Sequence, residues 1–413
     1  MKLATVSFNT IPLGRPLPFS LRTADGILLA SKGYIFAERE ALDTLAAHGT
    51  LYVDEEESKM YRRAMASQMH ALVNNQDTTV GQIAESRLSS IELQYNPALG
   101  GGGGGTDDLL ADNDAPIDWL DMQSRANSLM RDPNSLRFLH RLDRLHKDLS
   151  TIAKRNPDTI LFALIHLTAS ETLFYSATHA MLVCVMCLLA ARDVLNWSPE
   201  LETAMARASL TMNLSMTELQ DQLSGQHQPP TPDQRRYIDT HASRSVEILQ
   251  KRGVTDPVWL GAVLHHHSSV SGPLAGRIPA QQIARLIQRA DGFAARLSPR
   301  ASRAPMAPSA AMQATYFDET RKVDEAGASL IKAVGIYPPG SFVKLASNEI
   351  ATVVRRGINT LTPRVAVLVN KQGLPMVEPA IRDTRLPEYR IVASVSYKDI
   401  KVRSDLVRLL TLT

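Results

Sequence analysis

The sequence predicts a mainly α-helical protein, α+β overall, with a small β-rich module at its N-terminus and a β appendage at its C-terminus. Apolar residues recur at helical spacing from about residue 117 to 335. Residues 10–55 and 336–413 instead carry short runs in which apolar and polar residues alternate. Six consecutive glycines, Gly100 to Gly105, lie between the first of these regions and the helices. We therefore expect strands and helices in separate parts of the chain.

The N-terminal strands are expected to form a module over residues 1–60. Their alternating pattern contains the turn signals "ADG" and "SKG" and is followed by one short helix. Residues 61–116 are predicted to be a helical segment and a glycine-rich linker. The six glycines would lose too much backbone entropy in a packed core, so they are expected to behave as flexible coil.

Residues 117–335 are predicted to form a multi-helix bundle. Segments of helix length are separated there by "SGQHQPPTPDQ", "RGVTDPVW" and "SGPLAGRIP", which contain glycine and proline. After "GIYPPG" the period changes to two, in "SFVKLASNEIATVVRR", "RVAVLVN" and "EYRIVASVSY", with turns at "ASNE" and "KQG". Residues 336–413 are therefore predicted to be the β appendage.

Composition narrows the class of protein. The 413 residues are 44% hydrophobic and 21% charged, which is typical of a globular soluble protein. The net charge is only +3 and basic residues occur in short pairs, so no nucleic-acid partner is expected. The N-terminus lacks an apolar signal core, and "MLVCVMCLLAA" is too short to span a bilayer. We expect a cytoplasmic protein without a membrane span.

The two cysteines, Cys184 and Cys187, lie three residues apart in an apolar helical run. They form no disulfide framework, which fits a reducing compartment. A redox motif is one interpretation of "CVMC". Two small core residues are the favoured interpretation, because the motif lacks the strand-to-helix setting that thiol chemistry uses.

Several ionisable side chains lie on the apolar faces of the predicted helices. They are His179, His241, His266 or His267, and Asp291, each in line with apolar residues at helical spacing. One inward histidine is usually a hydrogen-bonded core residue. Burying several imidazoles and a carboxylate together is costly, and a shared metal ion or anionic ligand is a common way to offset that cost.

A methionine stripe lies on the predicted helix "ELETAMARASLTMNLSMTELQDQL". Met205, Met212 and Met216 share this face with Ala208 and Leu219. Flexible thioethers fill irregular space, so a core role is favoured. A soft-metal site made of Met and His side chains is the alternative.

The order and spacing of these segments resemble the HD-GYP family, bacterial metal-dependent phosphodiesterases that cleave cyclic di-GMP. The resemblance covers about residues 130–370. It implies an HD-superfamily helical bundle with a bi- or trinuclear iron-type centre. The matching segments are "FYSATHAM" with His179, "DTHASRSVEIL" with His241, "LHHHSSVSGPLAG" with His266 and His267, "ARLIQRAD" with Asp291, and "VGIYPPGSFVKLASNEIATVV".

Two ligand positions of the family's metal centre differ in this chain. Met212 and Asn213 stand where the family has its His-Asp pair, and Met216 stands at the following lysine position. A carboxylate can bridge two cations and offset their charge, whereas a neutral amide binds one cation weakly. The resemblance therefore implies that hydrolysis by the family mechanism is severely impaired.

The loop that carries the family's Gly-Tyr-Pro signature is also changed. Ser268 stands at its glutamate position and Ser271 at its aspartate position. Gly272 is kept, and Leu274, Ala275 and Gly276 replace the signature tripeptide. Contacts of this loop with substrate and partner are therefore not expected to be preserved.

The resemblance assigns His241, His266 and His267 to one metal position, and His179 and Asp291 to the remnant of another. The expected cofactor is none or one transition-metal ion, Fe, Zn or Mn. Three functions stay open: a degenerate signalling protein that binds cyclic di-GMP or a protein such as a GGDEF-type cyclase, a hydrolase that uses the three-histidine site, and a structural scaffold.

Overall fold

The computed structural model describes residues 3–6, 20–23, 28–30, 51–54, 93–94, 117–170, 174–268, 271–400 and 406–413. The chain divides into two compact units, Met1–Asp112 and Asn113–Thr413. The predicted glycine linker lies outside the described residues.

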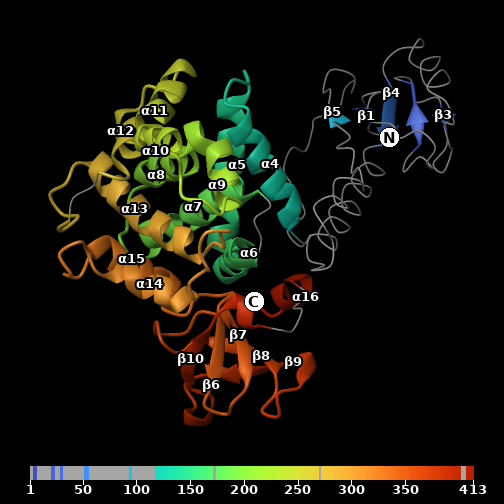
Figure 1. Ribbon diagram of the computed structural model, residues 1–413, viewed down its shortest axis with the longest axis vertical. Coiled ribbons are helices and arrows are strands. Elements are labelled where there is room, and N and C mark those ends of the chain that lie inside the picture. The colour runs from blue at the N-terminus through green and yellow to red at the C-terminus, as the bar shows by residue number, and fades with distance from the viewer. Residues whose placement is uncertain are drawn as a thin grey trace. The chain divides into compact units, whose positions relative to one another are not determined.

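The first unit contains a five-stranded antiparallel sheet with the order β3-β2-β4-β1-β5 (Figure 1). The predicted β-rich module is therefore present, but its fifth strand lies within residues 61–116, where a helical segment and linker were predicted. The fifth strand pairs with the first, Val6 lying opposite Leu93. The strands are β1 (Leu3–Val6), β2 (Leu21–Arg22), β3 (Leu28–Ala30), β4 (Leu51–Asp54) and β5 (Leu93–Gln94).

The second unit begins with the predicted helical bundle (Figure 1). The helices are α4 (Trp119–Arg131), α5 (Phe138–Arg155), α6 (Pro157–Ser170), α7 (Tyr175–Asp193), α8 (Pro199–Thr211), α9 (Thr217–Ser224), α10 (Pro232–Asp239), α11 (His241–Lys251), α12 (Pro257–His265), α13 (Pro279–Leu297), α14 (Pro308–Tyr316) and α15 (Glu325–Val334).

Helix α7 is the centre of the bundle. Its residues from Tyr175 to Ala191 are all buried, and it packs against α6, α8, α13 and α15. A helix that is apolar on all sides is stable only when neighbours surround it. Among the described residues α7 alone is long and apolar enough to cross a membrane, and 94% of that apolar window is buried inside the protein.

The predicted helix over residues 200–223 is broken in the structure. Helix α8 ends at Thr211, a short 3₁₀ turn covers Leu214–Met216, and α9 follows. The backbone N–H of Ser215 donates to Ser245 Oγ (3.1 Å), and the Ser215 hydroxyl donates to the His241 carbonyl oxygen (2.8 Å). These contacts with α11 replace hydrogen bonds within a continuous helix.

The predicted β appendage is a second five-stranded antiparallel sheet, with the order β10-β6-β7-β8-β9. One face packs with Phe162 of α6 and Leu409 of the short helix α16 (Leu406–Leu410). Gly340 allows this close approach, because a Cβ there would lie 3.0 Å from the Phe162 carbonyl oxygen. The strands are β6 (Phe342–Leu345), β7 (Ile350–Arg355), β8 (Arg364–Val369), β9 (Pro375–Asp383) and β10 (Ile391–Val395).

Candidate functional site

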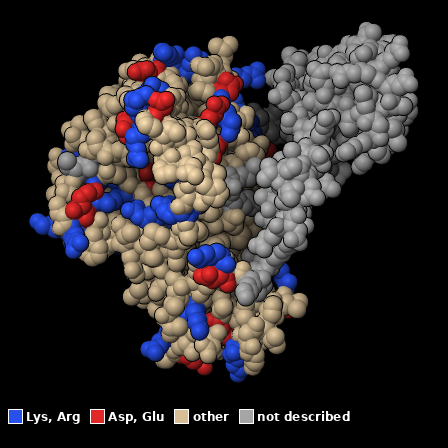
Figure 2. All heavy atoms as spheres, viewed as in Figure 1, with Lys and Arg blue, Asp and Glu red and all other residues tan. Residues whose placement is uncertain are grey.

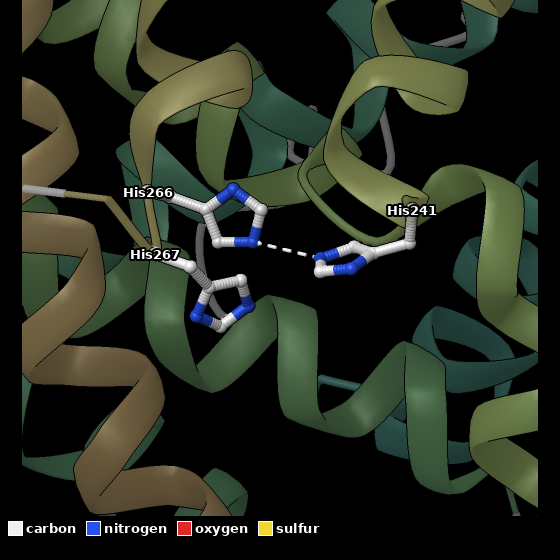
Figure 3. Close-up of side chains that lie close together, drawn as sticks. All are labelled: His241, His266 and His267. Carbon is white, nitrogen blue, oxygen red and sulfur yellow. Dashed lines mark hydrogen bonds between the residues drawn. The ribbon is translucent and has the colours of Figure 1, made fainter. Parts of the chain in front are cut away.

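Three histidines meet between α11 and α12. His241 is the first residue of α11, and His266 and His267 directly follow α12. One ring nitrogen from each of the three lies within 4.8 Å of the others (Figure 3). His241 and His266 are buried, whereas His267 is exposed. The sequence left open whether His266 or His267 points inward, and the structure buries His266.

The backbone fixes the tautomer of the two buried imidazoles. The Nδ1–H group of His266 donates to the Val263 carbonyl oxygen (2.6 Å), and that of His241 donates to the Ile238 carbonyl oxygen. A carbonyl oxygen only accepts, so each Nδ1 carries a proton and each Nε2 presents a lone pair. The two Nε2 atoms face one another at 3.1 Å (Figure 3). Two such lone pairs repel unless a proton or a metal ion lies between them.

A shared proton is disfavoured in this pocket. Burial, together with the neighbouring His267, lowers the pKa of His266 to about 3. Burial also lowers the pKa of His241 below its usual value. Both rings are therefore neutral near pH 7, which is the state in which imidazole binds metal ions.

His241 and His266 are spaced as two ligands of one transition-metal ion, and a ring nitrogen of His267 lies within 4.8 Å of theirs. Two imidazole nitrogens on one tetrahedral zinc ion lie roughly 3.3 Å apart, since each Zn–N bond is about 2.0–2.1 Å. The 3.1 Å between His241 and His266 is close to that value. A backbone carbonyl on the far ring nitrogen is the usual partner that orients a metal-binding histidine.

His179 and Asp291 form a separate pair. Asp291 Oδ1, on α13, accepts a hydrogen bond from Nε2 of His179, on α7, at 2.7 Å. Burial alone would raise the pKa of Asp291, but this hydrogen bond and the nearby imidazoles hold it well below its usual range. The carboxylate is therefore ionised and already hydrogen-bonded.

Met212, Asn213 and Met216 lie at the break between α8 and α9. Met212 is fully buried, and Met216 is half-buried. Asn213 Oδ1 is buried and has no hydrogen-bond partner among the described residues. This segment brings no charge to the pocket, although it packs on the first turn of α11 through Ser215 and His241.

The altered loop after α12 is held by hydrogen bonds within the loop and to Glu325 of α15. The Leu274 N–H donates to Glu325 Oε2 (2.6 Å), and Leu274 is buried. The Arg277 guanidinium donates to the carbonyl oxygens of Gly272 and Pro273. The loop is therefore tied to the start of α15.

A basic turn that the sequence analysis did not identify lies beside the His179 pair. Arg300 donates to the Tyr175 hydroxyl (3.1 and 2.8 Å), and the Tyr175 ring stacks on His179 with 6.0 Å between ring centres. Burial and the neighbouring Arg300 lower the pKa of Arg303. The salt bridges in the described part of the chain include none of Arg296, Arg300 and Arg303. The sequence "RLSPRASR", which contains three arginines and no acidic residue, could have indicated this basic turn.

Cys184 and Cys187 are both free and buried in α7. Burial raises the pKa of Cys184 to about 12, and burial also raises that of Cys187. Neither thiol forms a thiolate near neutral pH, which supports the core interpretation over the redox one.

Comparison with known proteins finds one curated protein and one solved structure to which the chain is similar. No family model matches the chain. The cyclic di-GMP phosphodiesterase PA4108 of Pseudomonas aeruginosa is 24% identical over 231 residues, 55% of this chain and 55% of that protein. The chain thus matches about half the length of this relative. The structure of Bd1817, a HDG"Y"P protein from Bdellovibrio bacteriovorus, aligns over 80% of this chain and 98% of its own, with 11% identity and a TM-score of 0.38.

Proposed function

We propose, taking the chain's membership of the HD-GYP family as the premise, that its helical bundle is a catalytically degenerate signalling domain that binds cyclic di-GMP without hydrolysing it. The observation that supports this most is a complete three-histidine cluster combined with Met212 and Asn213 at the family's His-Asp positions. One iron, zinc or manganese ion would be held by His241, His266 and His267, and would supply a Lewis acid for a phosphate oxygen.

The loss of hydrolysis follows from charge. In a two-metal phosphodiesterase both ions stabilise the entering and leaving oxygens, and a carboxylate between them offsets their repulsion. Asn213 is neutral and Met212 is a buried thioether, so neither offsets a second dication. The remaining carboxylate, Asp291, is hydrogen-bonded to His179.

Binding of an anionic ligand is supported by the basic turn. Arg300 donates to the hydroxyl of Tyr175, whose ring stacks on His179, and Arg303 lies near both Arg300 and Arg296. Guanidinium groups without a carboxylate partner are suited to a phosphodiester, since they donate two parallel hydrogen bonds to it. We propose that this turn binds a phosphate of the ligand.

A hydrolase that uses the single three-histidine site is the second candidate. It is favoured by the same cluster, because one metal ion with an open position can activate water for attack on phosphorus. A GGDEF-type cyclase as partner and a cytoplasmic location stay predictions.

The test combines binding with turnover on the full chain. Cyclic di-GMP is titrated calorimetrically into protein reconstituted with iron, zinc or manganese, and the same samples are analysed for linear product. The proposal expects saturable binding with no turnover above the rate without protein. Binding with turnover would favour the hydrolase, and absence of both would contradict a cyclic di-GMP role.

Matched variants separate the parts of the site. Replacing both Arg300 and Arg303 by alanine is expected to weaken cyclic di-GMP binding at least about 100-fold, because each charge-assisted hydrogen bond contributes roughly 1.5–3 kcal/mol. Arg277→Ala is the control, since its guanidinium donates to the carbonyl oxygens of Gly272 and Pro273 in its own loop. If the double variant bound cyclic di-GMP as tightly as the wild type, the proposal that this turn binds a phosphate would be contradicted.

A further inference from the structure

The β appendage carries an excess of positive charge that the chain as a whole does not show. Residues 336–413 contain twelve Lys and Arg against six Asp and Glu, a net charge of +6, whereas the whole chain has +3. On the face seen in Figure 2, Lys and Arg side chains lie over this sheet at the bottom of the view, interspersed with Asp and Glu side chains.

Aliphatic side chains are exposed at one end of the same sheet. In the loop between β7 and β8, Ile358 is 91% and Leu361 is 56% exposed. Ile381 and Leu386, near the end of β9, are 44% and 49% exposed. The register places this end of β9 beside the start of β8, with Arg364 opposite Asp383.

The β7–β8 loop is held in a defined shape that leaves its apolar side chains outside. Asn359 Oδ1 accepts from the backbone N–H groups of Leu361 and Thr362, each at 2.9 Å. The Thr360 carbonyl accepts from the Ile336 N–H (3.1 Å). Ile358 and Leu361 are therefore exposed because hydrogen bonds hold the loop in this conformation.

Exposed arginines flank this loop on both sides. Arg355 precedes it and Arg364 follows it, and Arg355 also donates to the Thr413 carbonyl oxygen. Arg356 of this loop donates to Asp158 of α6 and to the Ala333 carbonyl oxygen of α15, so one side of the loop contacts the helices. The exposed aliphatic side chains between cations match the boundary of an anionic lipid layer, where apolar groups enter the acyl region and cations meet headgroups.

We propose that this end of the β appendage, defined by Ile358, Leu361, Ile381 and Leu386, docks on an anionic lipid surface. Nucleic acid is less suited, because single-stranded nucleic acids stack on aromatic rings and the exposed large apolar residues of the described appendage are all aliphatic. The proposal goes beyond the proposed function, because no residue of the histidine site takes part.

The test is co-sedimentation of the full chain with lipid vesicles. Phosphatidylcholine vesicles with about 30% phosphatidylglycerol are compared with phosphatidylcholine alone, at low salt and at about 0.5 M NaCl. We expect binding to the anionic vesicles only, and a loss of binding at high salt. No binding to anionic vesicles, or equal binding to both, overturns the proposal.

Variants locate the surface. Ile358→Ser with Leu361→Ser, which adds no charge, is expected to lower the partition coefficient at least about tenfold, since two aliphatic side chains lose their burial. Val377→Ser is the control, because Val377 is 83% exposed near the opposite end of β9. An unaffected double variant, or an equal loss in the control, overturns the assignment. Binding to polyglutamate instead of vesicles would assign the surface to an acidic protein.

Discussion

The Nε2 atoms of His241 and His266 lie 3.1 Å apart, while Nδ1 of each ring donates to a backbone carbonyl oxygen. This relationship predicts a metal ligand pair. We expect His241→Ala and His266→Ala each to weaken zinc affinity about 100-fold or more, since a ligand is lost outright. Competition with a chelator of known affinity measures this. His265→Ala is the control, because His265 is an exposed neighbour, and equal affinities in all four proteins would exclude the site.

Restoring the family residues is expected to restore a second metal position. In the double variant Met212→His, Asn213→Asp, a carboxylate is added at the break between α8 and α9, and its charge is expected to offset a second dication. Elemental analysis of the reconstituted variant is expected to give about two metal ions per chain. The same number of metal ions per chain as in the wild type would show that other residues prevent binding of a second metal ion.

The contact between α6 and the appendage predicts a pH dependence of stability. His166 stacks on Phe162 and lies edge-on to Tyr397. Burial lowers the pKa of His166 from 6.5 to about 4. The neutral ring is therefore favoured on folding, and its contribution is complete above about pH 6.5 and is lost as the pH falls towards 4.

Comparison with His166→Phe isolates this effect. The ring keeps its stacking position in the variant but takes up no proton. Between pH 7 and pH 5 the wild type is expected to lose about 2 kcal/mol more free energy of unfolding than the variant. Urea denaturation at both pH values measures the difference, and parallel losses would contradict the assignment.

Gly327 in α15 predicts a strong local constraint on packing. A Cβ at this position would lie 1.9 Å from the Thr315 carbonyl oxygen, a backbone atom. Gly327→Ala is expected to lower the free energy of unfolding by about 3 kcal/mol, because α14 and α15 must separate. Gly225→Ala is the control, since its nearest atom would be 3.9 Å away. A stability equal to that of the control would show that the two helices separate at little cost.

The fold could be predicted from the sequence where the hydrophobic period changes at a glycine- or proline-containing break. The helical period ends near Gly335, and "YPPG" separates it from the alternating strands of the appendage. The end of α8 at Thr211 was not predictable, because the methionine stripe continues through Met216 while the break depends on Ser215 bonding to a distant helix.

Ionisable residues on apolar helix faces could be identified from the sequence, whereas their geometry and the basic turn could not. His179, His241 and Asp291 stood out because ionisable residues on apolar faces need partners, and the structure pairs His179 with Asp291. The choice of His266 over His267 as the buried ring could not be made from the sequence, because neighbouring residues fit the helical spacing about equally well. That choice depends on where α12 ends.

The number of metal ions bound by the wild-type chain tests the central claim most directly. Purified protein is reconstituted with excess iron, zinc or manganese under anaerobic conditions, desalted and analysed for metal and protein. A neutral Asn213 and the one histidine cluster found in the described part of the chain predict about one ion per chain for the metal that binds best. Two ions per chain would contradict the account, because they would show that the pocket holds a paired centre without the bridging carboxylate.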